Sequence, residues 1–304
     1  MRRYWPLLVV LASLWGSSYL FIKVGVEGGL SPSALMCGRT LLAGSLLFAY
    51  LAATLGGRRA LSELRAAWRQ CAVLGVVSNA VPFWLIAWGE QYVDSGVAAI
   101  AQATVPLFTI VLGLRFLPHE PLTRTRWLGL ALGLVGVGVL TGLHPGGGWP
   151  AVAGTLAVVL SSLSYGIGGV VGQRSISGTS GPVLATGAVL AGSLFLAPFA
   201  ALDFPENVPD GDALLSLVAL AVLGTALAQL LFYRLVRFYG SRRASLVTYL
   251  MPGFALLYGA VLLDEPLTVA ALAGLALILA GVALGSGAAE ARAARAAGAP
   301  ARCR

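Results

Sequence analysis

The sequence predicts an all-α integral membrane protein with ten transmembrane helices, built as two inverted five-helix repeats with both termini cytoplasmic. Three observations predict this fold: the apolar composition, the placement of the basic residues along the chain, and a short internal repeat.

The composition excludes an ordinary soluble domain. Of the 304 residues, 58% are hydrophobic and only 11% are charged, and the mean hydropathy is +0.86. Soluble domains carry about 25% charged residues, so this chain has too few charges to cover a surface that faces water. A lipid bilayer removes that demand, because the outside of a membrane-spanning fold is apolar. The net charge of +8 comes from loop residues rather than from one basic face, which argues against nucleic acid as a partner.

The chain contains ten apolar segments, each close to the roughly 20 residues that span a bilayer as a helix. They are residues 4–26, 31–54, 70–88, 95–116, 127–143, 149–172, 181–202, 214–236, 244–263 and 267–285. The first segment follows Met1-Arg2-Arg3 but has no Ala-x-Ala cleavage site, so we interpret it as an uncleaved span. Pro82, Pro106 and Pro252 fall inside spans and are expected to kink them.

The charges in the loops predict the orientation. If the N-terminus is cytoplasmic, every basic residue except Lys23 and Arg39 lies on the cytoplasmic side. The opposite loops carry acidic residues instead: Glu27, Glu90, Asp94, Asp203, Glu206, Asp210, Asp212, Asp264 and Glu265. Basic residues in short loops stay in the cytoplasm. Since a wrong helix count would break this alternation, the pattern also supports ten spans.

A motif repeats between the two halves of the chain. Glu120-Pro-Leu-Thr123 recurs as Glu265-Pro-Leu-Thr268, and the helices that follow align without a gap. Five helices is an odd number, so the second copy must be upside down relative to the first. We therefore divide the chain into a first repeat (1–145), a second, inverted repeat (146–287) and an Ala/Arg-rich cytoplasmic tail (288–304). Inverted repeats with a site between the halves are typical of alternating-access transporters.

Several stretches resemble a known family. Leu14-Trp-Gly-Ser-Ser-Tyr-Leu-Phe-Ile-Lys23 resembles its Trp-Gly…Lys signature, and Arg39-Thr-Leu-Leu-Ala43 is similar to its Arg-x3-Ala pattern. Residues 98–106 with the first Glu-Pro-Leu-Thr, and residues 245–268 in the second half, resemble its fourth-helix region. Together, over residues 5–286, they resemble the EamA-type branch of the drug/metabolite transporter superfamily. This resemblance implies a secondary carrier in a bacterial inner membrane, often an exporter of amino acids or related metabolites.

Two cations lie within predicted spans. Arg39 is roughly 12 Å inside its span, close to the bilayer midplane. A cation at that depth costs at least about 2.5–3.5 kcal/mol on insertion scales, so it should face the bundle interior. We expect it to attract a carboxylate or other anionic group of the substrate; the alternative is a clamp on the backbone carbonyls of a broken helix. Lys23, about 8 Å from the outer end of its span, either contributes to the site or extends to the interface.

Other polar and aromatic residues at mid-span depth complete the predicted substrate site between the two halves. They are Trp15, Ser18, Asn79, Trp84, Gln102, Tyr165, Gln229 and Tyr249, with Ser161 and Ser164 nearby. For each polar one, the alternative is an interhelical hydrogen bond. Small multidrug exporters of the same superfamily depend on a buried Glu in the first helix. The first span here has none, so zwitterionic or anionic solutes fit better than lipophilic cations.

Enzymatic and metal chemistry find little support. Cys37, Cys71 and Cys303 show neither disulfide nor zinc spacing, His119 and His144 lie in loops, and no Asp is mid-span. We therefore expect no cofactor and no catalytic residues. A lipid-carrier or drug flippase of the same superfamily, and a passive channel, remain alternatives.

The expected partners are a small-molecule substrate and the lipid bilayer, with the chain acting as a monomer or a homodimer. Gly129/Gly133 and Gly281/Gly285 are small-xxx-small spacings. Such spacings seat a helix against a neighbour or against a second copy of the chain.

The predicted topology can be tested with introduced cysteines. In intact cells, an impermeant thiol reagent should label cysteines placed at Asp94 or Asp210, because their loops face outward. Cysteines placed at Arg58 or Arg242 should stay unlabelled. Labelling at Arg58 or Arg242 would contradict the model.

Overall fold

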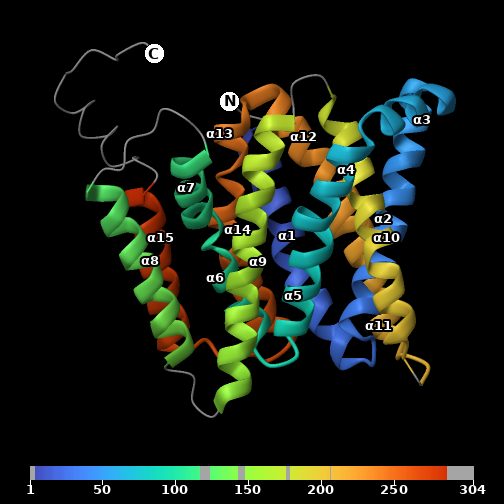
Figure 1. Cartoon of the computed structure of the whole chain (residues 1–304). Helices are drawn as coiled ribbons and strands as arrows, with labels where there is room; N and C mark the ends of the chain where they lie inside the picture. The colour runs from blue at the N-terminus through green and yellow to red at the C-terminus, as the bar shows by residue number, and fades with distance from the viewer. Residues whose placement is uncertain (1–3, 117–123, 143–147, 176–178, 206, 286–304) are drawn as a thin grey trace, which may run out of the picture.

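The computed structural model describes residues 4–116, 124–142, 148–175, 179–205 and 207–285, and every regular element in these ranges is helical (Figure 1). Seven of these helices are long and apolar enough to cross a membrane, and three shorter apolar helices accompany them. The helices lie side by side in one bundle (Figure 1). The first Glu-Pro-Leu-Thr motif, both histidines, Cys303 and the tail lie outside the described residues.

The helices follow the predicted spans to within a few residues. The first half contains α1 (Tyr4–Glu27), α2 (Pro32–Leu55), α3 (Gly57–Ala66), α4 (Trp68–Gly75), the π-helical segment η1 (Val76–Ala80), α5 (Val81–Gly89), α6 (Ser95–Gln102), α7 (Val105–Phe116) and α8 (Arg124–Gly142). The second half contains α9 (Gly148–Ser175), α10 (Gly181–Leu202), α11 (Gly211–Ala219), the π-helical segment η2 (Leu220–Leu227), α12 (Ala228–Tyr239), α13 (Ser241–Ala244), α14 (Val247–Leu262) and α15 (Val269–Gly285).

The connection after α2 differs from the expected short turn, because it contains the helix α3. Gly56, at a φ of 86°, ends α2 with a backbone conformation that favours glycine. The α3 sequence is rich in Ala, Leu, Arg and Glu, and Arg59 pairs with Glu63 one turn later at 3.1 Å. Ala60 is buried in a small cluster with Leu51 and Cys71, which holds α3 against the bundle.

The third and fourth apolar segments of each half are irregular. η1 interrupts the helical segment 68–89, and η2 interrupts the segment 211–239. The fourth segments are broken at residues 103–104 and 245–246. Pro82 and Pro106 are the second residues of the helices that follow η1 and the first break, where a residue without a backbone N–H is tolerated. Pro252 lies inside α14, and η2 contains no proline.

The two ends of the bundle differ in charge. α1 begins and α15 finishes at the same end as α3 and α13 (Figure 1). This basic end carries the arginines of α3 and the segment around α13. The ends of α1, α5, α10 and α14 lie at the opposite, acidic end (Figure 1), where the chain carries Glu27, Glu90, Asp203 and Asp264.

Glycines bring α8 and α15 into close contact along one side of the bundle (Figure 1). A Cβ atom at Gly281 would lie 2.5 Å from the carbonyl oxygen of Gly129 and 2.7 Å from the amide nitrogen of Gly133. A Cβ atom at Gly136 would lie 3.0 Å from the carbonyl oxygen of Gly274. These glycines therefore seat one helix on the other within a single chain, and the contact leaves no room for a side chain.

This seam predicts a stability effect. Gly281→Ala should destabilise the protein by about 1–3 kcal/mol, because the new methyl group meets backbone atoms that cannot rotate away. Gly253→Ala is the matched control, since a Cβ there meets nothing within 4 Å. Thermal unfolding of the purified proteins in detergent compares the two variants. Equal unfolding midpoints would show that the close contact between α8 and α15 does not require glycine at 281.

Candidate functional site

Arg39 is buried at the centre of the candidate site. It is 5% exposed, and its Nε donates to the Thr225 hydroxyl at 2.9 Å. Its Nη1 lies 3.8 Å from the Met36 sulfur, and its Cζ lies 3.9 Å from the centroid of the Phe83 ring. Thr225 belongs to η2 and Phe83 to the helix that follows η1. The side chain thus faces the interior, as its depth predicts, and touches the irregular third segments of both halves.

The Arg39 guanidinium is only partly used by the protein. A guanidinium has five N–H donors, and two of them have a partner among the described residues. Within the same part of the chain, no carboxylate lies within ion-pair distance of Arg39, and no backbone carbonyl accepts from it. Arg39 therefore does not bind backbone carbonyls of the described residues directly, as the predicted alternative required; Thr225 links it to one. Thr225 donates its own hydroxyl to the carbonyl of Leu220 at 3.0 Å and accepts from Arg39.

Several aromatic side chains belong to the same apolar core as Phe83. The main apolar core contains Tyr19 and Phe83, and the half-buried Trp15, Trp84, Tyr165 and Tyr249 pack against it. Phe83 also contacts Tyr165 edge to face, with ring centroids 6.5 Å apart. Four of the predicted site residues thus pack against this core.

Several other predicted site residues make hydrogen bonds within the protein. Asn79, in η1, donates to the carbonyl of Leu74 in the preceding helix α4 at 3.4 Å, and the Gln102 side-chain oxygen accepts from Ser161 at 2.7 Å. Ser18 donates to the Leu14 carbonyl at 3.3 Å, and the Trp84 indole donates to Ser33 at 3.1 Å. Ser164, named beside the predicted site, donates to the Val77 carbonyl at 2.8 Å. Asn79 and Ser164 satisfy carbonyls in or beside the irregular segment η1.

Other polar groups make no hydrogen bond within the described part of the chain. Among the described residues, the hydroxyls of Tyr19, Tyr165 and Tyr249 and the amide of half-buried Gln229 have no hydrogen-bond partner. Of these groups, Tyr165 contacts the Phe83 ring that also lies against Arg39. The sequence reasoning missed Tyr19, Phe83 and Thr225 as site residues. A hydroxyl within an apolar run marks Thr225, and Tyr19 directly follows Ser18, but nothing local marks Phe83.

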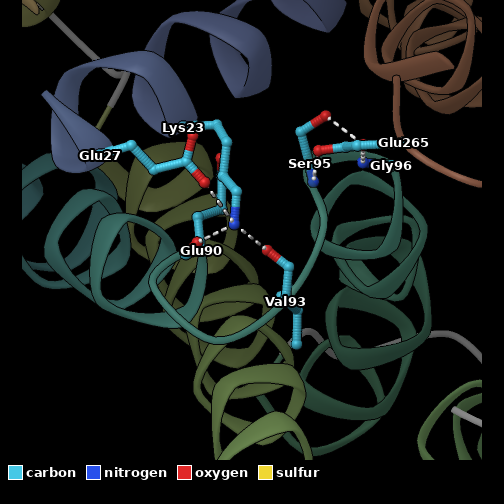
Figure 2. Close-up of polar contacts among 7 residues, drawn as sticks. All are labelled: Lys23, Glu27, Glu90, Val93, Ser95, Gly96 and Glu265. Atoms are coloured by element: carbon cyan, nitrogen blue, oxygen red, sulfur yellow. Dashed lines mark hydrogen bonds and ion pairs between the residues drawn. The ribbon is translucent and has the colours of Figure 1, made fainter. Parts of the chain in front are cut away.

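Lys23 belongs to a separate network at the acidic end. Its ammonium donates to the backbone carbonyls of Glu90 at 2.9 Å and Val93 at 3.1 Å, and it pairs with Glu27 at 3.3 Å (Figure 2). It therefore ties α1 to the turn between α5 and α6. Lys23 is a structural cross-link in this conformation rather than a free interfacial cation.

Glu265 fixes the other side of the same turn. Its carboxylate accepts from the Ser95 amide at 2.7 Å, the Ser95 hydroxyl at 2.8 Å and the Gly96 amide at 3.2 Å (Figure 2). These amides are the unpaired donors at the start of α6, where a negative charge is favoured. A residue of the second half therefore caps a helix of the first. We call Lys23, Glu27, Glu90, Val93, Ser95, Gly96 and Glu265 the acidic-end network.

Glu90, which follows the apolar segment Trp68–Gly89, is the exception in this network. It is fully buried, and neither carboxyl oxygen has a hydrogen-bond partner in the described part of the chain. Burial raises the pKa of the Glu90 carboxyl well above its usual range. The Lys23 ammonium opposes the rise, and the Glu265 carboxylate adds to it.

The architecture and the site together define a class. An all-helical bundle of apolar segments, with a buried cation between two irregular helices, is typical of a polytopic membrane transporter. The model of the EamA-like transporter family matches residues 3–142 and again residues 152–286. The chain belongs to the EamA-like transporter family.

Known relatives agree with this assignment. An uncharacterized transporter of Archaeoglobus fulgidus is 29% identical over 278 residues, covering 91% of this chain and 96% of that protein. The uncharacterized inner membrane transporter YedA of Escherichia coli K12 is 32% identical over 270 residues, covering 86% and 83%. A "Probable terminal-alkyne amino-acid exporter" of Streptantibioticus cattleyicolor is 29% identical over 290 residues, covering 93% of both chains.

A protein of known crystal structure shares the fold. It superposes on 94% of this chain and 97% of its own length with a TM-score of 0.66, at 22% sequence identity.

The cap on α6 predicts a stability effect. Glu265→Gln should destabilise the protein by about 1–3 kcal/mol, because one of three donors loses its acceptor and the charge at the helix start disappears. Asp264→Asn is the control, since it removes a charge from the exposed neighbouring residue and leaves the cap intact. Thermal unfolding in detergent measures both, and a Glu265→Gln protein as stable as Asp264→Asn would exclude the cap as a stabilising contact.

Proposed function

We propose that the chain is a secondary transporter that exports small zwitterionic or anionic metabolites, such as amino acids, across a bacterial inner membrane by alternating access. One observation carries the proposal: Arg39 is buried between the two halves with three of its five N–H donors unused by the described residues.

The chemistry of Arg39 favours a carboxylate. A planar guanidinium binds a carboxylate through two parallel hydrogen bonds, and such charge-assisted bonds are stronger than neutral ones. The site has low exposure and no acidic partner within the described residues, so the charge is available to a ligand. The uncommitted hydroxyls of Tyr19 and Tyr165 supply further donors or acceptors for polar groups of the same ligand.

The arrangement of the helices supports alternating access. α1 and α9, the first helices of the two proposed repeats, run in opposite directions, as do α8 and α15, the last ones (Figure 1). We propose ten spans with both termini cytoplasmic, so that the basic end faces the cytoplasm and the acidic end faces outward. Irregular helices next to a central site are the usual construction of such carriers.

The direction of transport and the kind of substrate rest partly on a relative. The Streptantibioticus cattleyicolor protein is named as an amino-acid exporter, and it aligns with nearly the whole of this chain. An amino acid carries the carboxylate that the buried Arg39 favours. We place the whole site within one chain, which is compatible with a monomer and with a homodimer.

Counterflow in liposomes tests this function with amino acids as probes. Wild-type protein should show exchange that is stimulated by amino acid on the opposite side, because a carrier is trans-stimulated and a channel is not. Arg39→Gln should lower the apparent affinity for carboxylate substrates about ten- to a hundredfold, as expected for losing a hydrogen bond to a charged group. Arg39→Lys, which keeps the charge but not the planar fork, should retain partial affinity.

Thr225→Val is the matched control. It removes a hydrogen-bond partner of Arg39 but leaves the guanidinium in place, so it should lower stability more than affinity. If Arg39→Gln folds normally and binds carboxylates as tightly as wild type, Arg39 does not recognise the substrate. If exchange is absent for every amino acid and organic acid, the proposed substrate class is wrong.

A further inference from the structure

The three donors of the Lys23 ammonium, next to Glu90, are all engaged by groups other than the Glu90 carboxyl. An ammonium group has three N–H donors. The Lys23 ammonium donates to the Glu90 carbonyl and the Val93 carbonyl and pairs with the Glu27 carboxylate (Figure 2). The nearest cation therefore has no hydrogen bond left for the Glu90 carboxyl, although it is bonded to the backbone of that same residue.

Both carboxyl oxygens of Glu90 are shielded from water. The residue is fully buried, and the end of α5 packs tightly on α9. At the preceding Gly89, a Cβ atom would lie 2.7 Å from the carbonyl oxygen of Gly154. An ionised carboxylate enclosed without a hydrogen bond is strongly unfavourable, and one bound proton removes its charge.

Four charged groups act electrostatically on the Glu90 carboxyl, which in turn acts on the titratable Tyr19 hydroxyl of α1. Lys23 and Glu27 come from α1, Glu265 from the segment before α15, and Arg39 from α2. Lys23 and Arg39 favour the ionised carboxylate, Glu265 and Glu27 disfavour it, and each of these influences is smaller than that of burial. Desolvation then dominates and favours the neutral acid.

Glu90 lies where the two halves close on each other. Beside it, Glu265 of the second half holds Ser95 and Gly96 of the first. At the same end, the Gly28 carbonyl accepts from the Asp210 amide at 3.0 Å, and Ser31 donates to the Asp203 carbonyl at 2.6 Å. An opening between the halves at the acidic end would break these contacts and admit water to Glu90.

We propose that the Glu90 carboxyl is a proton-binding site linked to closure of the acidic end: the closed conformation holds the proton, and opening releases it. The inference rests on the proposed transport cycle, in which the acidic end faces outward. It makes an acidic external solution favour the return of the emptied carrier to its outward-closed form.

The direction of the pH effect follows from linkage. The closed conformation has the raised pKa, and the opened, hydrated carboxyl has an ordinary one near about 4.3. Closure is therefore favoured at low pH, and this advantage is lost as the pH rises through the pKa of the closed form. Between the two pKa values, the closed-to-open ratio falls by up to about tenfold per pH unit.

The test measures how accessible the acidic end is at two external pH values. Val97→Cys, in a background carrying Cys37→Ser, Cys71→Ser and Cys303→Ser, reports opening, because Val97 is 3% exposed just after the Glu265 contact. Val208→Cys, at a position 90% exposed, corrects for the effect of pH on the impermeant maleimide itself. The ratio of the two labelling rates should be about tenfold lower at about pH 5.5 than at about pH 8.

Variants of the carboxyl assign the effect. Glu90→Gln, a permanently neutral replacement of similar shape, should keep the ratio low at both pH values; Glu90→Met serves the same purpose if the Gln variant does not fold. Asp212→Asn, which neutralises an exposed carboxyl at the same end, should keep the full pH dependence. The inference is overturned if wild-type labelling ignores pH, or if Glu90→Gln responds to pH as wild type does. Amino-acid counterflow is scored separately, so failure of the proposed substrate class is distinguished from failure of this linkage.

Discussion

The burial of one guanidinium constrains the centre of this protein. A cation at mid-depth in an apolar bundle is costly, and here the cost is offset by the Phe83 ring face and the Thr225 hydroxyl. Both partners lie in the third segments, one in each half, beside or within a π-helical turn. Regular helices at these positions would aim the two side chains differently. The burial of Arg39 therefore depends on the π-helical turns, and it links the two halves.

The π-helical turns explain why polar residues occur in otherwise apolar segments. A helix that departs from its regular ladder leaves carbonyls to be satisfied, and in lipid no water can do this. Ser164 and Asn79 satisfy carbonyls in or next to η1, and Thr225 satisfies Leu220 in η2. A polar side chain with such a task is part of the scaffold. A half-buried polar side chain without such a task, such as Tyr165, is not part of this scaffold, which is why we propose it as a ligand contact.

Part of the fold and of the candidate site could be predicted from the sequence. Hydropathy predicted the apolar segments to within a few residues, because a bilayer imposes one length and one polarity on every span. The depth of Arg39 predicted its burial. The sequence did not predict η2, because no proline marks it, or α3, because its helical character comes from local charge pairs rather than from hydropathy. The Glu265 cap on α6 was also missed, since the contact joins residues far apart in the chain.

The hydrogen bonds that close the acidic end are made largely between the two halves. Hydrogen bonds to charged groups contribute about 1.5–3 kcal/mol each, and water replaces much of that when they open. The closed and open forms can then differ by only a few kcal/mol, whereas an apolar interface of the same extent would bind the halves permanently. A ligand that binds one form more tightly can overcome a free-energy difference of that size. Polar closure at the end of the bundle and an uncommitted charge at its centre are therefore complementary requirements of one carrier.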